Sequence, residues 1–161
     1  MADVRIEPAR VDDLPVILSL IRGLAEYERL AHECVGGEDE LRRWLFGDSP
    51  AAEVVIARAG AAAVGFALFF RNFSTFLARP GLYLEDLFVV PEWRGRGIGR
   101  ALLVHLAGIA VERGYRRFEW SVLDWNEPAI AFYRKMGATI MDDWRICRVT
   151  GEALAALASR A

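Results

Sequence analysis

The stretch VVPEWRGRGIGRALL, residues 89–103, carries the strongest structural signal in the chain. A strand is expected to end at Pro91, and a helix to begin among three alternating glycines: Gly95, Gly97 and Gly99. Glycine lets the backbone approach a ligand closely, and the first N–H groups of a helix point outward without intrahelical partners. Three arginines add permanent positive charge: Arg94, Arg96 and Arg100. The segment therefore predicts a loop that binds the phosphates of a nucleotide.

The spacing of the glycines distinguishes between known kinds of nucleotide-binding loop. A dinucleotide-binding GxGxxG motif would need glycine at position 100, where this chain has Arg100. A P-loop needs Gly-Lys followed by Ser or Thr, and the sequence contains no such tripeptide. The pattern that fits is Arg/Gln-x-x-Gly-x-Gly/Ala, which is met by Arg94, Gly97 and Gly99. This segment resembles the GNAT superfamily of N-acetyltransferases.

The resemblance implies that the loop holds the pyrophosphate of acetyl-coenzyme A (acetyl-CoA) and that the preceding strand pairs with its pantetheine arm. It also implies a second half of the site in WNEPAIAFYRKMGA, residues 125–138. There Asn126 is placed to cap a helix, and Tyr133 lies two turns further along the same face. In GNAT enzymes this tyrosine protonates the departing thiolate. The cofactor-binding residues expected from the resemblance are Leu87, Phe88, Val89, Arg94, Gly95, Arg96, Gly97, Ile98, Gly99, Arg100 and Asn126.

A closer resemblance, to the diamine (spermidine/spermine-type) N-acetyltransferases, covers nearly the whole chain. It is carried by LAEYE at 24–28, GFALFF at 65–70, YLEDLFVVPEWRGRGIG at 83–99 and WNEPAIAFYRKMGA at 125–138. It implies that Glu85 accepts the proton of the amine, directly or through a water. It also implies that Tyr27 and Glu28, together with Glu85 and Asp86, bind a cationic substrate. The expected catalytic residues are Tyr133 and Glu85.

The sequence leaves the identity of the amine open. The polyamine enzymes carry an acidic residue before an aromatic one where this chain has Ser74, so one negative contact is missing. A diamine, a polyamine and a lysine-like amino acid all remain candidate substrates. Two other functions also stay open, a non-catalytic acyl-CoA-binding regulatory module and a peptide or protein N-acetyltransferase. Transfer is expected to be direct, because neither Cys34 nor Cys147 lies in the motifs.

The resemblance further implies a homodimer in which each amine pocket is built from both subunits. Glu28 of one subunit would then face Glu85 of the other. Residues 71–82 have an apolar composition that a partner subunit or the chain's own core would have to cover. The side chains concerned are Phe73, Phe76, Leu77 and Leu82.

Composition and charge argue against several other classes of function. The 20 basic and 22 acidic residues leave a net charge of -2, without the positive field that nucleic-acid binding needs. The longest apolar run, residues 59–70, is far shorter than the roughly 20 residues that cross a bilayer. Two distant cysteines predict neither a disulfide nor a metal site. With no signal-peptide pattern at its start, the protein is expected to be cytoplasmic.

Hydrophobic periodicity predicts a single mixed α/β domain over residues 1–161. The resemblance implies that this domain is an N-acetyltransferase domain with a GNAT-like fold. The sheet is expected to be mixed and mostly antiparallel, with helices on both faces. Strands are expected at residues 4–7, 53–57, 62–70, 83–90, 118–123 and 139–149. Helices are expected from about residue 12 to 27, at 38–46, 97–113 and 126–136, and in the alanine-rich terminal segment.

Overall fold

The computed structural model describes residues 4–160 of the chain. These residues form two compact units, which divide between Trp125 and Asn126. Each unit is considered by itself below. The prediction of one domain over residues 1–161 stays a prediction.

The first unit is built on one five-stranded sheet in the order β1-β2-β3-β4-β5. Its strands are β1 (Val4–Pro8), β2 (Glu53–Ala59), β3 (Ala62–Ser74), β4 (Arg79–Val89) and β5 (Phe118–Trp120). The first four are antiparallel neighbours, and β5 pairs with β4 in parallel. The expected mixed, mostly antiparallel sheet is therefore confirmed.

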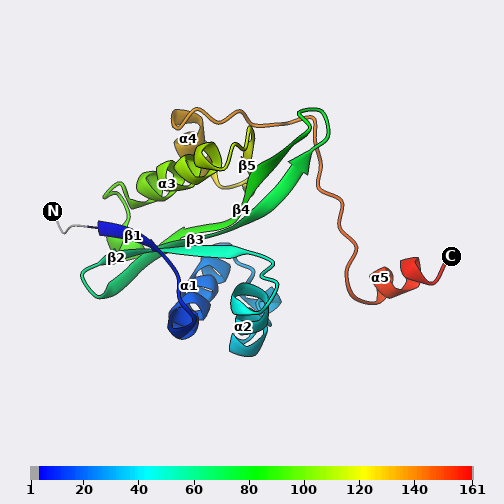
Figure 1. Ribbon diagram of the computed structural model, residues 1–161, viewed down its shortest axis with the longest axis horizontal. Coiled ribbons are helices and arrows are strands. Elements are labelled where there is room, and N and C mark those ends of the chain that lie inside the picture. Colours follow the sequence, from blue (N-terminus) through cyan, green and yellow to red (C-terminus); the bar gives the residue numbers. More distant parts are fainter. Residues whose placement is uncertain (1–3, 161) are drawn as a thin grey trace. The chain divides into compact units, whose positions relative to one another are not determined.

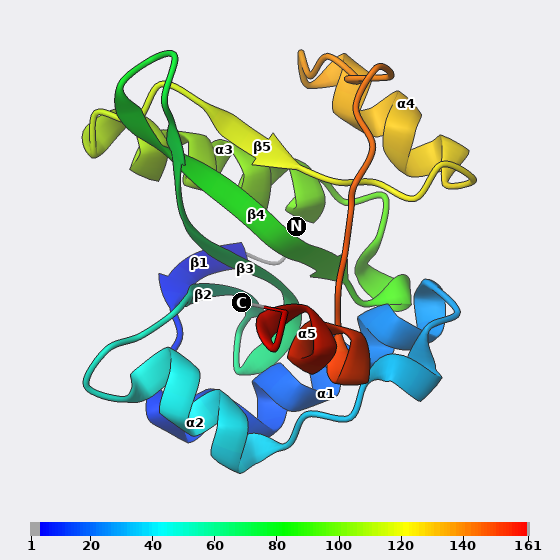
Figure 2. The same cartoon turned by 90° about the vertical axis from the view of Figure 1, so that its right-hand side faces the viewer.

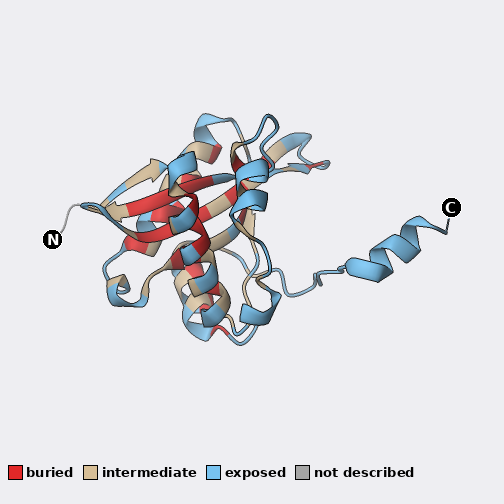
Figure 3. Cartoon of the chain, turned by 90° about the horizontal axis from the view of Figure 1, so that it is seen from below, coloured by how far each residue is buried: buried red, intermediate tan, exposed pale blue. Residues whose placement is uncertain are grey.

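Helices cover both faces of this sheet, as expected (Figure 1). On one face lie α1 (Leu14–Tyr27) and α2 (Glu38–Phe46), and on the other lies α3 (Ile98–Glu112). Short 3-10 helices, η1 (Val11–Asp13), η2 (Ala31–Glu33) and η3 (Pro91–Trp93), join these elements. The buried residues concentrate in the sheet and on the sides of the helices that face it (Figure 3).

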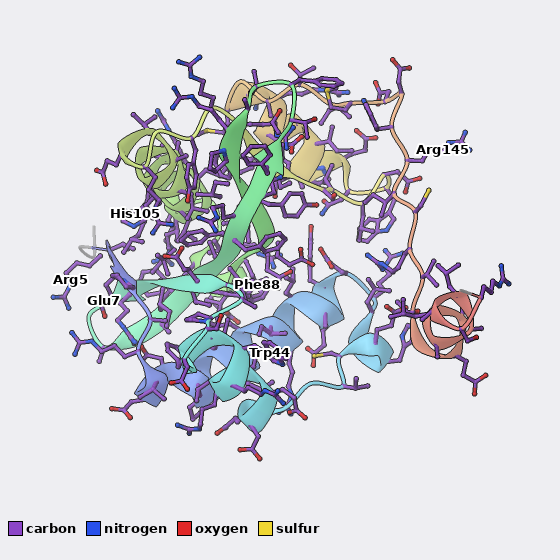
Figure 4. The ribbon with its side chains drawn as sticks, turned by 45° about the vertical axis from the view of Figure 1, so that its right-hand side comes forward. Arg5, Glu7, Trp44, Phe88, His105 and Arg145 are labelled. Atoms are coloured by element: carbon purple, nitrogen blue, oxygen red, sulfur yellow. The ribbon has the colours of Figure 1, made fainter. Side chains whose placement is uncertain are left out.

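The packing of α1 on the sheet brings its C-terminal end close to β4. Ile17, Leu20 and Leu24 recur at helical spacing and are buried in one cluster with Phe66 and Phe88 of the sheet. A Cβ atom at Gly23 would lie 3.0 Å from the Phe88 ring, so glycine at this position lets the helix approach the strand. Figure 4 shows Phe88 on the side of the sheet that faces α1. Tyr27 and Glu28, which follow at the end of α1, are thereby held over the site described below.

The second unit contains α4 (Glu127–Lys135) and α5 (Gly151–Ala158). The helices expected here are confirmed, but the expected strand at 139–149 is wrong, because residues 138–150 form neither helix nor strand. A strand needs a neighbour for its N–H and C=O groups, and no described strand pairs with this segment. Its apolar side chains are exposed: Met141, Trp144, Ile146 and Val149.

The segment 71–82 is part of a long β3–β4 hairpin. The two strands stay paired out to Ser74 and Arg79, so the pairing extends beyond the expected end of the strand at residue 70. Leu82 is buried in the sheet, whereas Phe73, Phe76 and Leu77 near the tip are exposed. The Ser74 hydroxyl accepts a hydrogen bond from the Leu77 N–H and so closes the turn.

Among residues 4–160, no helix has the length and apolar character needed to cross a membrane. The same residues hold no group of three or more histidine, cysteine or acidic side chains arranged to bind a metal ion.

Candidate active site

The glycine loop lies between the end of β4 and the start of α3, as the sequence predicts. Gly95 and Gly97 have φ angles of 72° and 81°, a left-handed conformation that other residues adopt only with strain. The first intrahelical hydrogen bond of α3 runs from the Ala101 N–H to the Gly97 carbonyl. The N–H groups ahead of that bond have no acceptor within the helix. They belong to Ile98, Gly99 and Arg100. A Cβ atom at Gly95 or Gly97 would meet no protein atom within 4 Å, so the space in front of the loop is open to a ligand.

The strand that leads into this loop has an open edge. β5 pairs with β4 only at Leu82, Tyr83 and Leu84, while β4 continues to Val89. In Figure 2 the chain that follows β5 runs away from β4. In the described part of the chain no strand pairs with residues 85–89 on this side. Backbone N–H and C=O groups on this edge can pair with an extended amide chain such as pantetheine.

A β-bulge at Glu85 places the acidic side chains. In the β3–β4 register Leu84 is opposite Phe69 and Asp86 is opposite Leu68, so Glu85 has no opposite residue. Without the bulge, Asp86 would share the face of Leu84, because side chains alternate along a strand. The bulge turns Asp86 to the other face, where Leu68 packs against the α1 cluster. Asp86 thus lies on the α1 side of the sheet.

Three carboxyl groups of the first unit interact at this point: Glu28, Glu85 and Asp86. Burial, reinforced by the charges of Glu85 and Glu28, raises the pKa of Asp86 from 3.8 to about 7. Burial and the charge of Glu85 also raise the pKa of Glu28. Glu85 itself is exposed in the bulge. This is the environment of a site that binds a cation and accepts a proton near neutral pH.

Glu28 and Glu85 interact within a single chain. The expectation that Glu28 also faces Glu85 of a second subunit stays a prediction. Ser74 lies six residues beyond Leu68 along β3, roughly 20 Å from the bulge, because a strand rises about 3.3 Å per residue. Within one chain, the missing acidic group at position 74 is remote from the acidic cluster.

Arg94 connects the glycine loop to the end of α1. Its Nε donates a hydrogen bond of 2.9 Å to the Val89 carbonyl oxygen. Its guanidinium carbon lies 4.5 Å from the centre of the Tyr27 ring and 5.5 Å from that of Phe88. Arg96 similarly stacks on Trp93 at 4.6 Å, while Arg100 is exposed. Part of the positive charge expected around the phosphates thus also packs against aromatic rings.

Asn126 and Tyr133 belong to the second unit. The Asn126 side chain accepts a hydrogen bond from the Ala129 N–H at 3.4 Å, so its predicted role as the N-cap of α4 is confirmed. Tyr133 is buried, and its ring centre lies 5.3 Å from that of Phe132. Their roles toward acetyl-CoA stay predictions.

Two residues beside this site are absent from the sequence-based assignment. Arg29 follows Glu28 directly, and its guanidinium carbon lies 4.7 Å from the centre of the Trp125 ring. Trp125 in turn lies 6.5 Å from the Tyr27 ring. The sequence offered one hint of their role, which is their place next to the motifs. Arg29 directly follows LAEYE at 24–28, and Trp125 is the first residue of the motif at 125–138.

A family model, two characterised proteins and one solved structure match most of this chain. A model of the acetyltransferase (GNAT) family matches residues 21–138. The thialysine N-epsilon-acetyltransferase of Mus musculus is 38% identical, over 99% of this chain and 100% of that protein. The L-ornithine N5-acetyltransferase of Arabidopsis thaliana is 33% identical, over 95% of this chain and 87% of that protein. A solved integron cassette protein from the V. cholerae mobile metagenome is 27% identical with a TM-score of 0.79, over 98% of both chains.

Proposed function

The chain belongs to the acetyltransferase (GNAT) family, and we propose that it transfers the acetyl group of acetyl-CoA to a primary amine of a small cationic molecule. The observation that carries the proposal is the arrangement of β4. One end of this strand leads into an open glycine loop, and its bulge places Glu85 and Asp86 beside Glu28. The acidic cluster on β4 and the glycine loop that follows this strand therefore support a cation site and a polyanion site close together in the chain.

The residues around the loop fit acetyl-CoA. The amides at the start of α3, the space before Gly95 and Gly97, and the exposed Arg100 suit a pyrophosphate. The open edge at residues 85–89 suits the amides of pantetheine. When bound, acetyl-CoA supplies the acetyl thioester on which the reaction depends.

The acidic cluster addresses the first difficulty of the reaction, which is the charge of the amine. An alkylamine with a pKa near 10.4 must lose a proton before it can attack, and at pH 7 this costs about 4.6 kcal/mol. Glu85 accepts that proton, directly or through a water. Asp86, with a pKa raised to about 7, can share it, because a base works best when its pKa lies near the working pH.

The transfer itself is direct. The nitrogen lone pair forms a bond to the acetyl carbon, the carbon–sulfur bond breaks, and the sulfur leaves with the electron pair. Tyr133 protonates the thiolate, and the nitrogen passes its second proton to water. Of the two protons that Glu85 and water have then taken from the amine, one returns to Tyr133 and the other is released to solvent. The products are the N-acetylated amine, coenzyme A as a thiol and one proton released to solvent. Tyr27 and Glu28 hold the cationic substrate.

The test measures the release of free thiol from acetyl-CoA over a panel of diamines, basic amino acids and short peptides. We expect turnover with small amines and little with peptides. The mouse and Arabidopsis relatives, whose names specify amino acids with a side-chain amine, guide the choice of panel. Binding of acetyl-CoA without turnover would indicate a regulatory module, and turnover with peptides alone would indicate a peptide acetyltransferase.

The working unit in this proposal is a homodimer in a reducing compartment such as the cytoplasm. Apolar side chains exposed at the hairpin tip support a second copy: Phe73, Phe76 and Leu77. The segment 139–149 exposes apolar side chains and pairs with no strand within residues 4–160, which also favours pairing with another copy. Both cysteines are free, which is compatible with a reducing compartment.

A further inference from the structure

Cationic and aromatic side chains alternate beside the acidic cluster. Arg94 packs on Tyr27, Tyr27 lies 6.5 Å from Trp125, and Arg29 packs on Trp125. All four residues belong to the first unit. Arg94 also holds the Val89 carbonyl and so adjoins the glycine loop. Arg29 stands at the other end of this row of side chains. Unlike Arg94, its side chain makes no hydrogen bond to a backbone carbonyl among the described residues.

The backbone of Arg29 is fixed by the end of α1. Its φ angle is 63°, a left-handed conformation that is unusual outside glycine. The Arg29 N–H donates to the Glu26 carbonyl, and the following Leu30 N–H donates to the Ala25 carbonyl. These bonds terminate the helix and direct residue 29 onto the indole of Trp125, which lies 4.7 Å from its guanidinium carbon. Arg29 is therefore a pre-positioned cation.

No described residue accepts a hydrogen bond from the side-chain donors of Arg29. Arg58, Arg113 and Arg117 each pair with a carboxylate. Within residues 4–160, no hydrogen bond or ion pair involves the Arg29 side chain, although Glu28 adjoins it. A guanidinium that stacks on an aromatic ring keeps the N–H groups along its edge available, and that edge matches a carboxylate. Arg29 is exposed, so a dissolved anion can reach it.

The two neighbouring charges define a ligand with two opposite charges. Glu28, with Glu85 and Asp86, suits an ammonium group, while the next residue suits a carboxylate. Consecutive side chains at a helix end point in different directions. They can therefore hold the ammonium group and the carboxylate at the two ends of one amino acid. We infer that Arg29, held on Trp125, binds the carboxylate of an amino-acid substrate whose side-chain amine receives the acetyl group. The inference rests on the proposed function, and it selects basic amino acids over diamines.

The test compares two substrates that differ only in the carboxylate, ornithine and putrescine. In the unaltered enzyme kcat/KM should be higher for ornithine. Arg29→Gln should lower kcat/KM for ornithine roughly 10- to 100-fold, the loss expected for a charge-assisted bidentate contact, and leave putrescine unchanged. Trp125→Ala should lower it less, and Trp125→Phe should retain most of it. Arg22→Gln changes another exposed arginine of α1 and serves as the matched control.

The selectivity between the two amines distinguishes recognition from a structural role. Equal kcat/KM values in the unaltered enzyme, or an equal loss on both substrates in Arg29→Gln, would overturn the inference. Calorimetric titration of the CoA-bound protein with each amine separates it from the proposed function. Binding of ornithine that depends on Arg29, without turnover of any amine, would refute the function and support the carboxylate site. Equal affinity for both amines would refute the site even in an active enzyme.

Discussion

Replacing Asp86 by asparagine should stabilise the protein at alkaline pH. Asparagine has nearly the same shape as aspartate but carries no charge. In the folded chain, burial and the charges of Glu85 and Glu28 raise the pKa of Asp86 from 3.8 to about 7. In the unfolded chain this carboxyl group ionises freely. Above about pH 7 the folded protein must therefore hold a charge that its surroundings oppose.

The sign and size of the effect follow from the difference between the two pKa values. A pKa raised by folding contributes stability that is fully present below pH 3.8 and is lost as the pH rises to about 7. The whole difference corresponds to a ceiling of about 4 kcal/mol at 1.36 kcal/mol per pH unit. Residual contact with solvent reduces it, so we expect a gain of roughly 1–3 kcal/mol for Asp86→Asn above pH 7. The gain should shrink toward zero near pH 4.

Urea unfolding at a series of pH values measures this gain as the difference in unfolding free energy between Asp86→Asn and the unaltered protein. Asp48→Asn, at an exposed aspartate outside the site, serves as the matched control and should show no such trend. Glu85→Gln should reduce the pH dependence attributed to Asp86, because it removes one of the charges that raise its pKa. A difference that is constant across this pH range, or a loss of stability at alkaline pH, would refute the reasoning.

Three further predictions concern the cofactor, the general acid and the assembly. Gly97→Asp should abolish binding of acetyl-CoA in calorimetry, because it places a carboxylate in the phosphate site, whereas Gly108→Asp on the exposed side of α3 should bind normally. Unchanged affinity in folded Gly97→Asp would contradict the assignment of the loop. Tyr133→Phe should lower kcat by about 10²- to 10⁴-fold with nearly unchanged cofactor affinity, and full kcat with chemistry rate-limiting would assign the proton transfer to another group. Sedimentation should show a homodimer that Phe76→Asp weakens, and a fully active monomer at micromolar concentration would argue against the dimer.

Local patterns in the sequence predict the frame of the site well. The three glycines and the apolar run before them predict where β4 ends and α3 begins, because helix starts and left-handed turns depend on neighbouring residues. The glycines flanking α2 and the cap at Asn126 act in the same way. The acidic pair Glu85 and Asp86 stands inside an apolar run of the sequence, and in the structure burial raises the pKa of Asp86 to about 7.

Features that depend on pairing between distant residues could not be read from the sequence. The bulge at Glu85 is a mismatch in register between β3 and β4, and it decides the face on which Asp86 lies. The contact of Arg29 with Trp125 joins residues far apart in the chain. The segment 139–149 is predicted to form a strand, but the local sequence does not show whether another strand is available to pair with its backbone. In each case the sequence does not show which distant segment pairs with or packs against the residues concerned.

The position of the acetyl group on the product tests the central claim most directly. The protein would be incubated with isotopically labelled acetyl-CoA and ornithine, and the product examined by NMR spectroscopy alongside a count of the thiol released. With the carboxylate held at Arg29 and the side-chain amine at Glu85 and Asp86, we expect the label on the side-chain nitrogen, with one thiol released per acetyl group transferred. Label on the α-nitrogen, or thiol release without acetylated ornithine, would contradict the account.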